Sequence, residues 1–207
     1  RAGAMNNNAP KFEDYVISYF TQHISDAVES SVWSGAAATN GQFEGFLTGT
    51  TGAFAVNGNV VQTNNTGGAG TAYTAANIIS NLQTIAAAIP STVYGKEDLR
   101  IYMNWKTYRL YVSAISALGY VNMYSMNNDY EATFEGIKLS VVYGMPDNKL
   151  VAAQVSNLFF GTDLVSDTTQ VKMLDMSPLD GSENIRFVAK FSGGVQVGIG
   201  AEVVQQD

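Results

Sequence analysis

The sequence contains no cysteine and only one histidine among its 207 residues. Without cysteine, a disulfide scaffold, a thiolate metal site and thiol catalysis are all excluded. A multi-histidine metal site and a serine–histidine–aspartate triad are not favoured either, because the only imidazole is that of His23. We interpret His23 as a surface or partly buried residue of a helix, and we expect the protein to use no cofactor.

Charge and long apolar runs are also scarce. Charged residues make up 14% of the chain, against the ~25% of an ordinary soluble domain. The net charge of −7 argues against a dedicated nucleic-acid binder with a strong basic field. No apolar run is long enough to predict a membrane-spanning helix, and no signal-peptide pattern occurs. Because the chain begins at Arg1 and not at Met, we expect a processed or excised piece of a longer product.

Hydrophobic residues reach 46%, so the chain is able to bury a sizeable core in one large or two small domains. From Phe12 onward, apolar residues recur every three or four positions, which predicts a helix at about 11–33. The following segment, 34–72, is rich in glycine and threonine and carries Glu44 as its single charge. We expect short strands there, with a turn at Asn57-Gly58.

The middle of the chain alternates helices with strands. Thr74 is predicted to cap a helix that ends before Pro90, and Asn104 to cap a second helix with Leu118 on its inner face. Near the end of the chain, alternating apolar residues on both sides of Ser192-Gly193-Gly194 predict a β-hairpin at about 184–204. Further strands are predicted at residues 99–103, 137–143 and 150–155.

Motifs for catalysis or phosphate binding are weak. The glycine-rich run at 67–70 precedes a helix, but a phosphate loop of the Walker type also needs a lysine. No lysine or arginine occurs between Phe12 and Gly95, so we interpret the run as a flexible loop. Acidic clusters such as Asp129 with Glu131 match no calcium-binding loop, and we expect them to be solvated turns. An enzyme is therefore not favoured.

Charges of opposite sign occupy different parts of the chain. Residues 12–95 carry five acidic residues and no basic one, whereas residues 96–110 carry four basic and two acidic residues. Such segregation suits head-to-tail contacts between subunits. Aromatic residues lie among the basic ones, as in single-strand nucleic-acid binders, but the two acids dilute that signal. The candidate subunit-contact residues are Glu13, Asp14, Asp26, Glu29, Lys96, Arg100, Lys106 and Arg109.

The order of these elements resembles the major capsid proteins of tailed bacteriophages, which have the Hong Kong 97-type shell fold. The resemblance extends over most of the chain, although no single motif is diagnostic. It rests on five segments: Glu29-Ser30-Ser31-Val32-Trp33-Ser34-Gly35 at the end of the long helix, Leu99-Arg100-Ile101-Tyr102-Met103-Asn104, Phe134-Glu135-Gly136-Ile137-Lys138-Leu139 leading to Met145-Pro146, Asn157-Leu158-Phe159-Phe160-Gly161-Thr162-Asp163, and the closing hairpin.

The resemblance implies an α+β fold with two domains. Residues 1–60 and 183–207 would form a peripheral domain, with a spine helix at about 11–33 and the return hairpin at about 184–204. Residues 61–182 would form an α/β axial domain. In this family an N-terminal arm and an extended loop precede the spine helix, and we expect both to be missing from this chain.

The implied function is structural, without catalysis. Many identical subunits would assemble into an icosahedral phage head around double-stranded DNA that they do not recognise specifically. Scaffold, portal and maturation protease would be partners, and a membrane would not. We expect the protein in the virion capsid, assembled in the cytoplasm of the bacterial host. The alternatives are the shell of an encapsulin-type compartment and, from a different class, a β-rich surface module that binds glycans.

Overall fold

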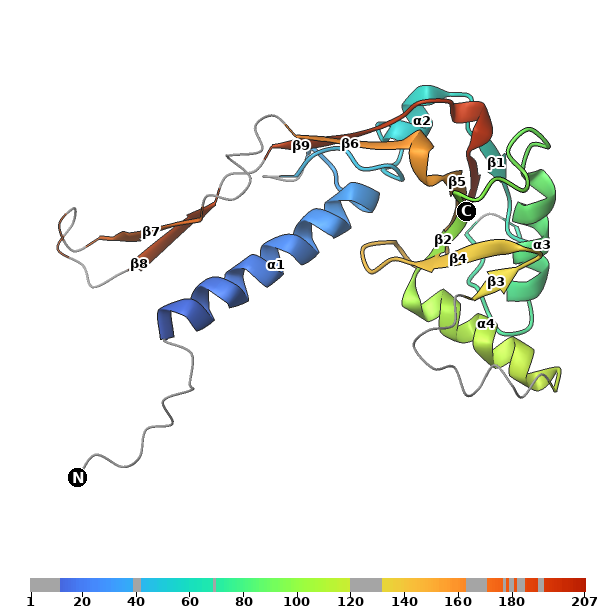
Figure 1. Ribbon diagram of the computed structural model, residues 1–207, viewed down its shortest axis with the longest axis horizontal. Coiled ribbons are helices and arrows are strands. Elements are labelled where there is room, and N and C mark those ends of the chain that lie inside the picture. Colours follow the sequence, from blue (N-terminus) through green and yellow to red (C-terminus); the bar gives the residue numbers. More distant parts are fainter. Residues whose placement is uncertain are drawn as a thin grey trace. The chain divides into compact units, whose positions relative to one another are not determined.

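The computed structural model describes residues 12–38, 42–68, 70–119, 132–162, 171–176, 178, 181, 185–189 and 192–207. The chain divides into two compact units. Unit 1 comprises Arg1–Val28 and Thr162–Gly193, and unit 2 comprises Glu29–Gly161 and Gly194–Asp207. Helices and strands are mixed, as the α+β prediction requires (Figure 1).

A six-stranded mixed sheet organises unit 2 (Figure 1). Its strands pair in the order β1-β10-β5-β2-β4-β3, with β1 parallel to β10, β2 parallel to β4, and the other neighbours antiparallel. The bounds are β1 Val61–Thr63, β2 Leu99–Met103, β3 Thr133–Phe134, β4 Ile137–Val141, β5 Leu150–Gln154 and β10 Val204–Gln206.

The central strand β5 is buried on both faces, and all five of its residues are inaccessible to solvent. Since successive side chains of a strand point to opposite faces, Leu150 and Ala152 enter one hydrophobic core and Val151 and Ala153 enter another. Residues of this kind, with apolar side chains in an unbroken run, are typical of a strand covered on both sides.

Two helices, α3 (Ile78–Ala88) and α4 (Trp105–Ala117), pack against each other and form the first core with one face of the sheet. Ile78, Leu82 and Ile85 of α3 recur at helical spacing and are fully buried. The second core joins Trp33, at the end of α1 (Phe12–Ser34), to the short helix α2 (Ala53–Asn57) and the opposite face of the sheet. Burial on both faces therefore fixes the sheet between two apolar layers.

The last turn of α1 belongs to unit 2 and is bonded to two of its loops. The Glu29 carboxylate accepts hydrogen bonds from the backbone N–H groups of Tyr143 and Gly144, at 2.9 and 3.4 Å. The helix carbonyls of Val32 and Trp33 accept bonds from the N–H groups of Phe46 and Leu47. Carbonyls at a helix end have no partner within the helix, so these bonds pair two of the last carbonyls of α1. The predicted helix at 11–33 is confirmed.

The predicted hairpin at 184–204 is wrong in its pairing. Strand β8 (Ile185–Ala189) lies where alternation predicts it, but β9 (Gly193–Val197) includes two glycines of the predicted loop and ends at Val197, before a 3-10 turn at Gly200–Glu202. The two strands do not pair with each other. Strand β8 pairs with β7 (Val171–Asp175), and β9 pairs with β6 (Leu158–Thr162). Periodicity locates a strand, whereas pairing depends on which distant strand offers a free edge.

Three local predictions also need correction. Asn57 ends the helix α2, and Gly58 is its left-handed cap (φ 68°), so this pair forms no hairpin turn. Helix α3 begins after Asn77 and not at Thr74, whose carbonyl accepts a bond from the Ile78 N–H group. Leu118 lies just beyond α4 and is 63% exposed, because the helix ends before it completes another inward turn.

Candidate subunit interface

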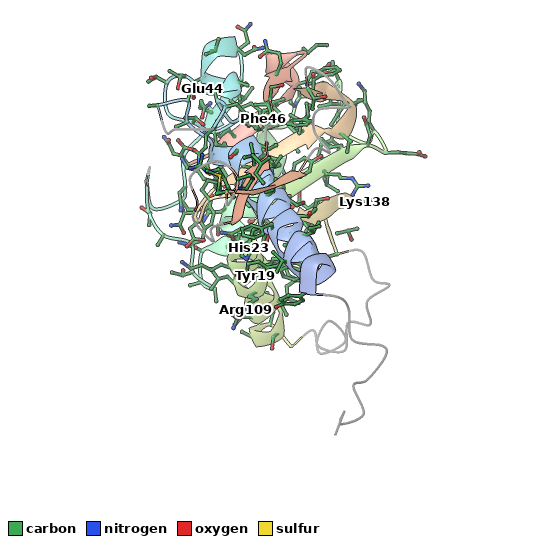
Figure 2. The ribbon with its side chains drawn as sticks, turned by 90° about the vertical axis from the view of Figure 1, so that its left-hand side faces the viewer. Tyr19, His23, Glu44, Phe46, Arg109 and Lys138 are labelled. Atoms are coloured by element: carbon green, nitrogen blue, oxygen red, sulfur yellow. The ribbon has the colours of Figure 1, made fainter. Side chains whose placement is uncertain are left out.

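Helix α1 presents an aromatic and acidic stripe, formed by Tyr15, Tyr19, His23 and Asp26. These residues follow at intervals of three and four, which places them on one face of the helix. The rings of Tyr15 and Tyr19 stack at 6.5 Å, and the His23 ring meets the edge of Tyr19 at 4.4 Å (Figure 2). Tyr15 and Tyr19 are 57% and 52% exposed. We call this surface the Tyr19 stripe.

The opposite face of α1 carries aliphatic and aromatic residues. Ile24 and Val28 are half-buried, while Ile17 and Phe20 remain exposed. A helix that covers a globular core normally has an apolar stripe on one side and charged residues on the other. In α1 the face opposite the apolar residues carries the exposed Tyr15 and Tyr19 and not mainly charged residues. Exposed tyrosines of this kind are typical of protein interfaces.

Helix α4 carries a second surface near its N-terminus, the Trp105 patch, made of the exposed Trp105 and Arg109 and the half-buried Tyr108, which also packs against the first core. Asn104 caps this helix as predicted, and its Oδ1 accepts a 2.8 Å bond from the Thr107 N–H group. The cap places Trp105 at the first helical position, where its ring is 58% exposed and meets Tyr108 edge-on at 5.9 Å. Arg109 follows four residues later, so it lies on the same face and is exposed (Figure 2).

Most of the predicted contact residues whose side chains are described have partners within unit 2. Lys106 forms an ion pair of 2.6 Å with Asp147, although both side chains are more than half exposed. Arg100 donates to the Ser140 hydroxyl at 3.2 Å, and Lys96 donates to Gln154 at 3.3 Å. Like Glu29, these three residues form bonds that hold together segments of their own chain.

Asp26 and Arg109 are different, since the described part of the chain gives neither of them an ion pair. Asp26 accepts a long 3.4 Å hydrogen bond from Gln22, one turn earlier in α1. Arg109 is exposed on α4. Glu13 and Asp14 belong to α1, but their side chains lie outside the described residues. That Asp26 and Arg109 are subunit-contact residues stays a prediction, and the sequence could not separate these two from charges that pair locally.

A third exposed surface lies around Asn157 in unit 2, and the sequence did not reveal it. Asn157 exchanges two hydrogen bonds with the backbone of Ile199, at 2.7 and 2.8 Å, which brings two distant segments together. Phe159 and Phe160 are 54% and 46% exposed although they are consecutive in β6 and therefore point to opposite faces. This pair of aromatic residues in a short strand was the available signal. Val56, Val155 and Ile199 are also largely exposed.

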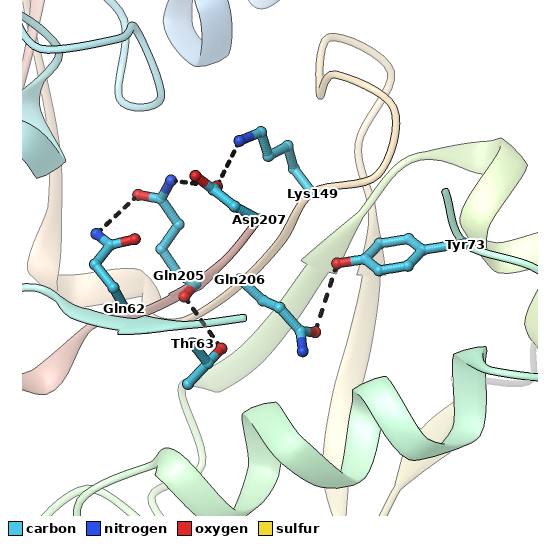
Figure 3. A network of polar contacts seen from close by, with 7 residues as sticks. All are labelled: Gln62, Thr63, Tyr73, Lys149, Gln205, Gln206 and Asp207. Carbon is cyan, nitrogen blue, oxygen red and sulfur yellow. Dashed lines mark hydrogen bonds and ion pairs between the residues drawn. The ribbon is translucent and has the colours of Figure 1, made fainter. Parts of the chain in front are cut away.

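A polar network holds the C-terminal strand β10 (Figure 3). Lys149 forms an ion pair with Asp207, and Gln205 donates to the same carboxylate at 2.7 Å. Burial would raise the pKa of Asp207, but the hydrogen bonds from Lys149 and Gln205 outweigh it, so the pKa lies below its usual value. Burial, together with the negative charge of Asp207, raises the pKa of Tyr73 well above its usual range. Tyr73 therefore stays a neutral donor to Gln206, and the network serves the fold.

Two more aspartates are tied to neighbouring segments. Asp98 accepts hydrogen bonds from Ser156 at 2.6 Å and Gln154 at 2.9 Å, and these bonds lower its pKa. The pKa of Asp147 is lowered by the hydrogen bond from Lys106. In both cases the charged carboxylate is stabilised by donors of another strand or helix. Neither aspartate is suited to act as a proton acceptor near neutral pH.

An open depression of about 660 Å³ lies beside the end of α3 and has Tyr94 and Glu135 on its rim. Its wall is otherwise made of small or apolar residues and two uncharged polar ones, and it brings no acid and base together. Among the described residues, no three side chains of the metal-binding type gather in one place. The predicted acidic turn at Asp129 and Glu131 lies outside the described residues. Within that part of the chain, no helix has the length and apolar character needed to span a membrane.

Comparison with known proteins shows the fold. No family model matches the sequence, and no curated protein matches it. The structure is similar to a chain of Mycobacterium phage Che8, with a TM-score of 0.60 and 12% identity over 95% of this chain and 63% of that one. It is also similar to the capsid of an empty GTA particle, with a TM-score of 0.60 and 16% identity over 97% of this chain and 67% of that one.

A third similar structure is the procapsid of satellite phage P4 with its size determination protein, with a TM-score of 0.55 and 10% identity. That comparison covers 96% of this chain and 64% of the other. The chain thus has a phage capsid fold, as its sequence resemblance predicts. It spans about two thirds of the length of these three chains.

Proposed function

We propose that this protein is a major capsid subunit, many copies of which assemble into an icosahedral phage head around double-stranded DNA. The observation that carries the proposal is the likeness of nearly the whole chain, 95–97% of it, to chains of phage capsids. A fold can host many functions, so the proposal also needs surfaces suited to self-association. The Tyr19 stripe, the Trp105 patch and the apolar residues around Asn157 are such surfaces.

In this proposal the fold is of the Hong Kong 97 type. The peripheral domain predicted at 1–60 and 183–207, and the axial domain predicted at 61–182, remain a prediction of how the subunit is divided within a shell. The compact units follow other boundaries, since β10 shares a sheet with β2 and β5.

The role we propose is structural and involves no catalysis. Each subunit would be held by several neighbours at once, so that modest individual contacts add up to a stable shell. Scaffold, portal and maturation protease are further proposed partners, and the packaged DNA would be enclosed without specific recognition. With a net charge of −7, the protein is suited to releasing DNA more than to trapping it. We propose the virion capsid as its location and the bacterial host cytoplasm as the place of assembly.

Expression of the whole gene product that carries this chain tests the proposal. We expect large particles, or five- and six-membered rings, in gradient sedimentation and negative-stain electron microscopy. Particles recovered from the phage host should protect double-stranded DNA from nuclease, whereas an encapsulin-type shell should contain protein cargo. A product that stays monomeric at every concentration and ionic strength, and binds a defined glycan on an array, would contradict the proposal and favour the glycan-binding alternative.

A further inference from the structure

We propose, on the basis of the capsid role, that the Tyr19 stripe of one copy binds the Trp105 patch of a neighbouring copy. The contact would place Asp26 of one subunit against Arg109 of the next. Tyr15 and Tyr19 of the stripe and Trp105 and Arg109 of the patch are exposed, and Asp26 is half-buried. Neither Asp26 nor Arg109 has an ion pair in its own chain among the described residues. The occupant of each surface is therefore a second copy of the same protein.

The composition of the two surfaces is that of an interface centre. Tryptophan, tyrosine and arginine supply most of the strongly contributing residues in measured protein interfaces. The stripe contributes Tyr15 and Tyr19, and the patch contributes Trp105 and Arg109. Their rings are already ordered by contacts with neighbours on the same helix, at 6.5 Å for the tyrosines and 5.9 Å for Trp105 with Tyr108. Pre-ordered side chains lose less conformational entropy when they bind.

Charge selects the pairing of stripe with patch. Asp26 is the acidic residue of the stripe and Arg109 is the basic residue of the patch, and α1 contains no lysine or arginine while α4 contains no acidic residue. Two stripes, or two patches, placed face to face would bring like charges together, which disfavours such pairings. A stripe against a patch brings opposite charges together, and the Arg109 guanidinium is able to stack on the face of Tyr19 while it binds Asp26.

A contact between two different surfaces is heterologous and therefore directional. Every copy then offers one stripe and one patch, and repeated contacts of this kind close into rings or continue as open arrays. A dimer that placed stripe on stripe, or patch on patch, would bring Asp26 against Asp26 or Arg109 against Arg109, and the like charges oppose that arrangement. The inference thus explains why acidic and basic residues are separated along this chain.

Charge reversal tests the contact. The variants Asp26→Lys and Arg109→Glu each place like charges opposite each other, and we expect each to lower the assembled fraction at least about tenfold at fixed concentration. When the two variants are mixed, the new lysine on the stripe of one copy faces the new glutamate on the patch of the next. Copies of the two variants that alternate in an assembly are then complementary, so mixing should restore assembly. A single chain that carries both Asp26→Lys and Arg109→Glu should also assemble, because its stripe and its patch again have opposite charges. Circular dichroism and thermal melting of each variant confirm that the subunit itself still folds.

Matched variants make the result specific. Glu97→Lys makes the same change of charge as Asp26→Lys at an exposed site that belongs to neither the stripe nor the patch, and it should assemble like the wild type. Arg109→Lys keeps the charge but loses the planar guanidinium, so an intermediate loss is expected.

If the wild type assembles and both reversals assemble equally well, the inference is wrong while the proposed function stands. If the chain with both substitutions assembles but the mixture of single variants does not, Asp26 and Arg109 pair within one copy. That result would also overturn the proposed contact between copies. A wild type that never assembles removes the proposed function and this inference together.

Discussion

At the scale of single residues, Gly144 is a position where the fold tolerates no larger side chain. A Cβ atom there would overlap the carbonyl oxygen of Glu29 and the backbone of Ser30, where the last turn of α1 meets the loop after β4. The same loop donates two N–H groups to the Glu29 carboxylate. Backbone on both sides leaves little room for adjustment, so the close approach requires glycine.

We expect Gly144→Ala to destabilise the protein by about 1–3 kcal/mol, because the added methyl group forces α1 and the loop apart. Urea denaturation followed by tryptophan fluorescence measures this directly, since Trp33 lies one turn beyond Glu29 in the buried core. Gly161→Ala is the matched control, because a Cβ at Gly161 meets no atom within 4 Å. Equal stability of the two variants would contradict the close approach of helix and loop.

At the scale of elements, α4 depends on one capping residue that also joins it to another loop. Asn104 accepts the Thr107 N–H bond with its Oδ1 and donates from its Nδ2 to Asp147 at 2.6 Å. Asp147 in turn pairs with Lys106, so the cap, the first turn of α4 and the loop before β5 form one small network. The start of the helix, and with it the orientation of the Trp105 patch, is set by these bonds.

Asn104→Ala should cost about 1–2 kcal/mol in free energy of unfolding, since it removes the cap and leaves helix N–H groups unpaired. Asn104→Ser restores an acceptor at the same position and should recover part of the loss. Ser113→Ala, on the exposed side of the same helix, should change stability little. Thermal or urea unfolding compares the three variants, and a loss for Ser113→Ala as large as that for Asn104→Ala would argue against the capping role.

At the scale of the whole molecule, three aspartates make the stability depend on pH. The pKa values of Asp98, Asp147 and Asp207 are all lowered in the folded protein by hydrogen bonds from other residues. A lowered pKa means that the folded state favours the charged form, so these groups stabilise the fold above the unfolded value of about 3.9. The stabilisation is lost as the pH falls through the folded pKa of each group.

We therefore expect the urea midpoint to be nearly constant between about pH 7 and 5 and to fall as the pH is lowered further toward about 3. Asp98→Asn removes one titrating group while its amide is still able to bond with Gln154 and Ser156, so the fall should be smaller in that variant. Ser113→Ala changes no titrating group and should follow the wild type. A midpoint that stays flat over the whole acidic range would rule out this dependence.

How much of this could be predicted from the sequence depends on the range over which each interaction acts. The apolar periodicity of α1, the alternation of β2 and the Asn104 cap all arise between residues a few positions apart, and the sequence predicted them correctly. The Asn57-Gly58 pair was misread because the same two residues suit a hairpin turn and a helix end equally well. Only the contacts of α2 with the second core decide between the two.

The candidate interface shows the same limit. Charge counting placed Asp26 and Arg109 among the contact residues, but it gave equal weight to Lys106, whose partner Asp147 lies 41 residues away. It also missed Phe159, which lies in the two-stranded pair β6-β9 and is 54% exposed.

The sequence by itself determined where the three long helices and the strands β2, β4, β5 and β8 lie, that thiol chemistry is absent and that acidic and basic residues are segregated, because these depend on composition and on short-range periodicity. The tertiary structure alone decided which strands pair, which charges are satisfied within the chain and which aromatic surfaces remain uncovered. Those properties arise when residues distant in the sequence compete for the same edge, carboxylate or patch of core, and local spacing carries no information about the outcome of that competition.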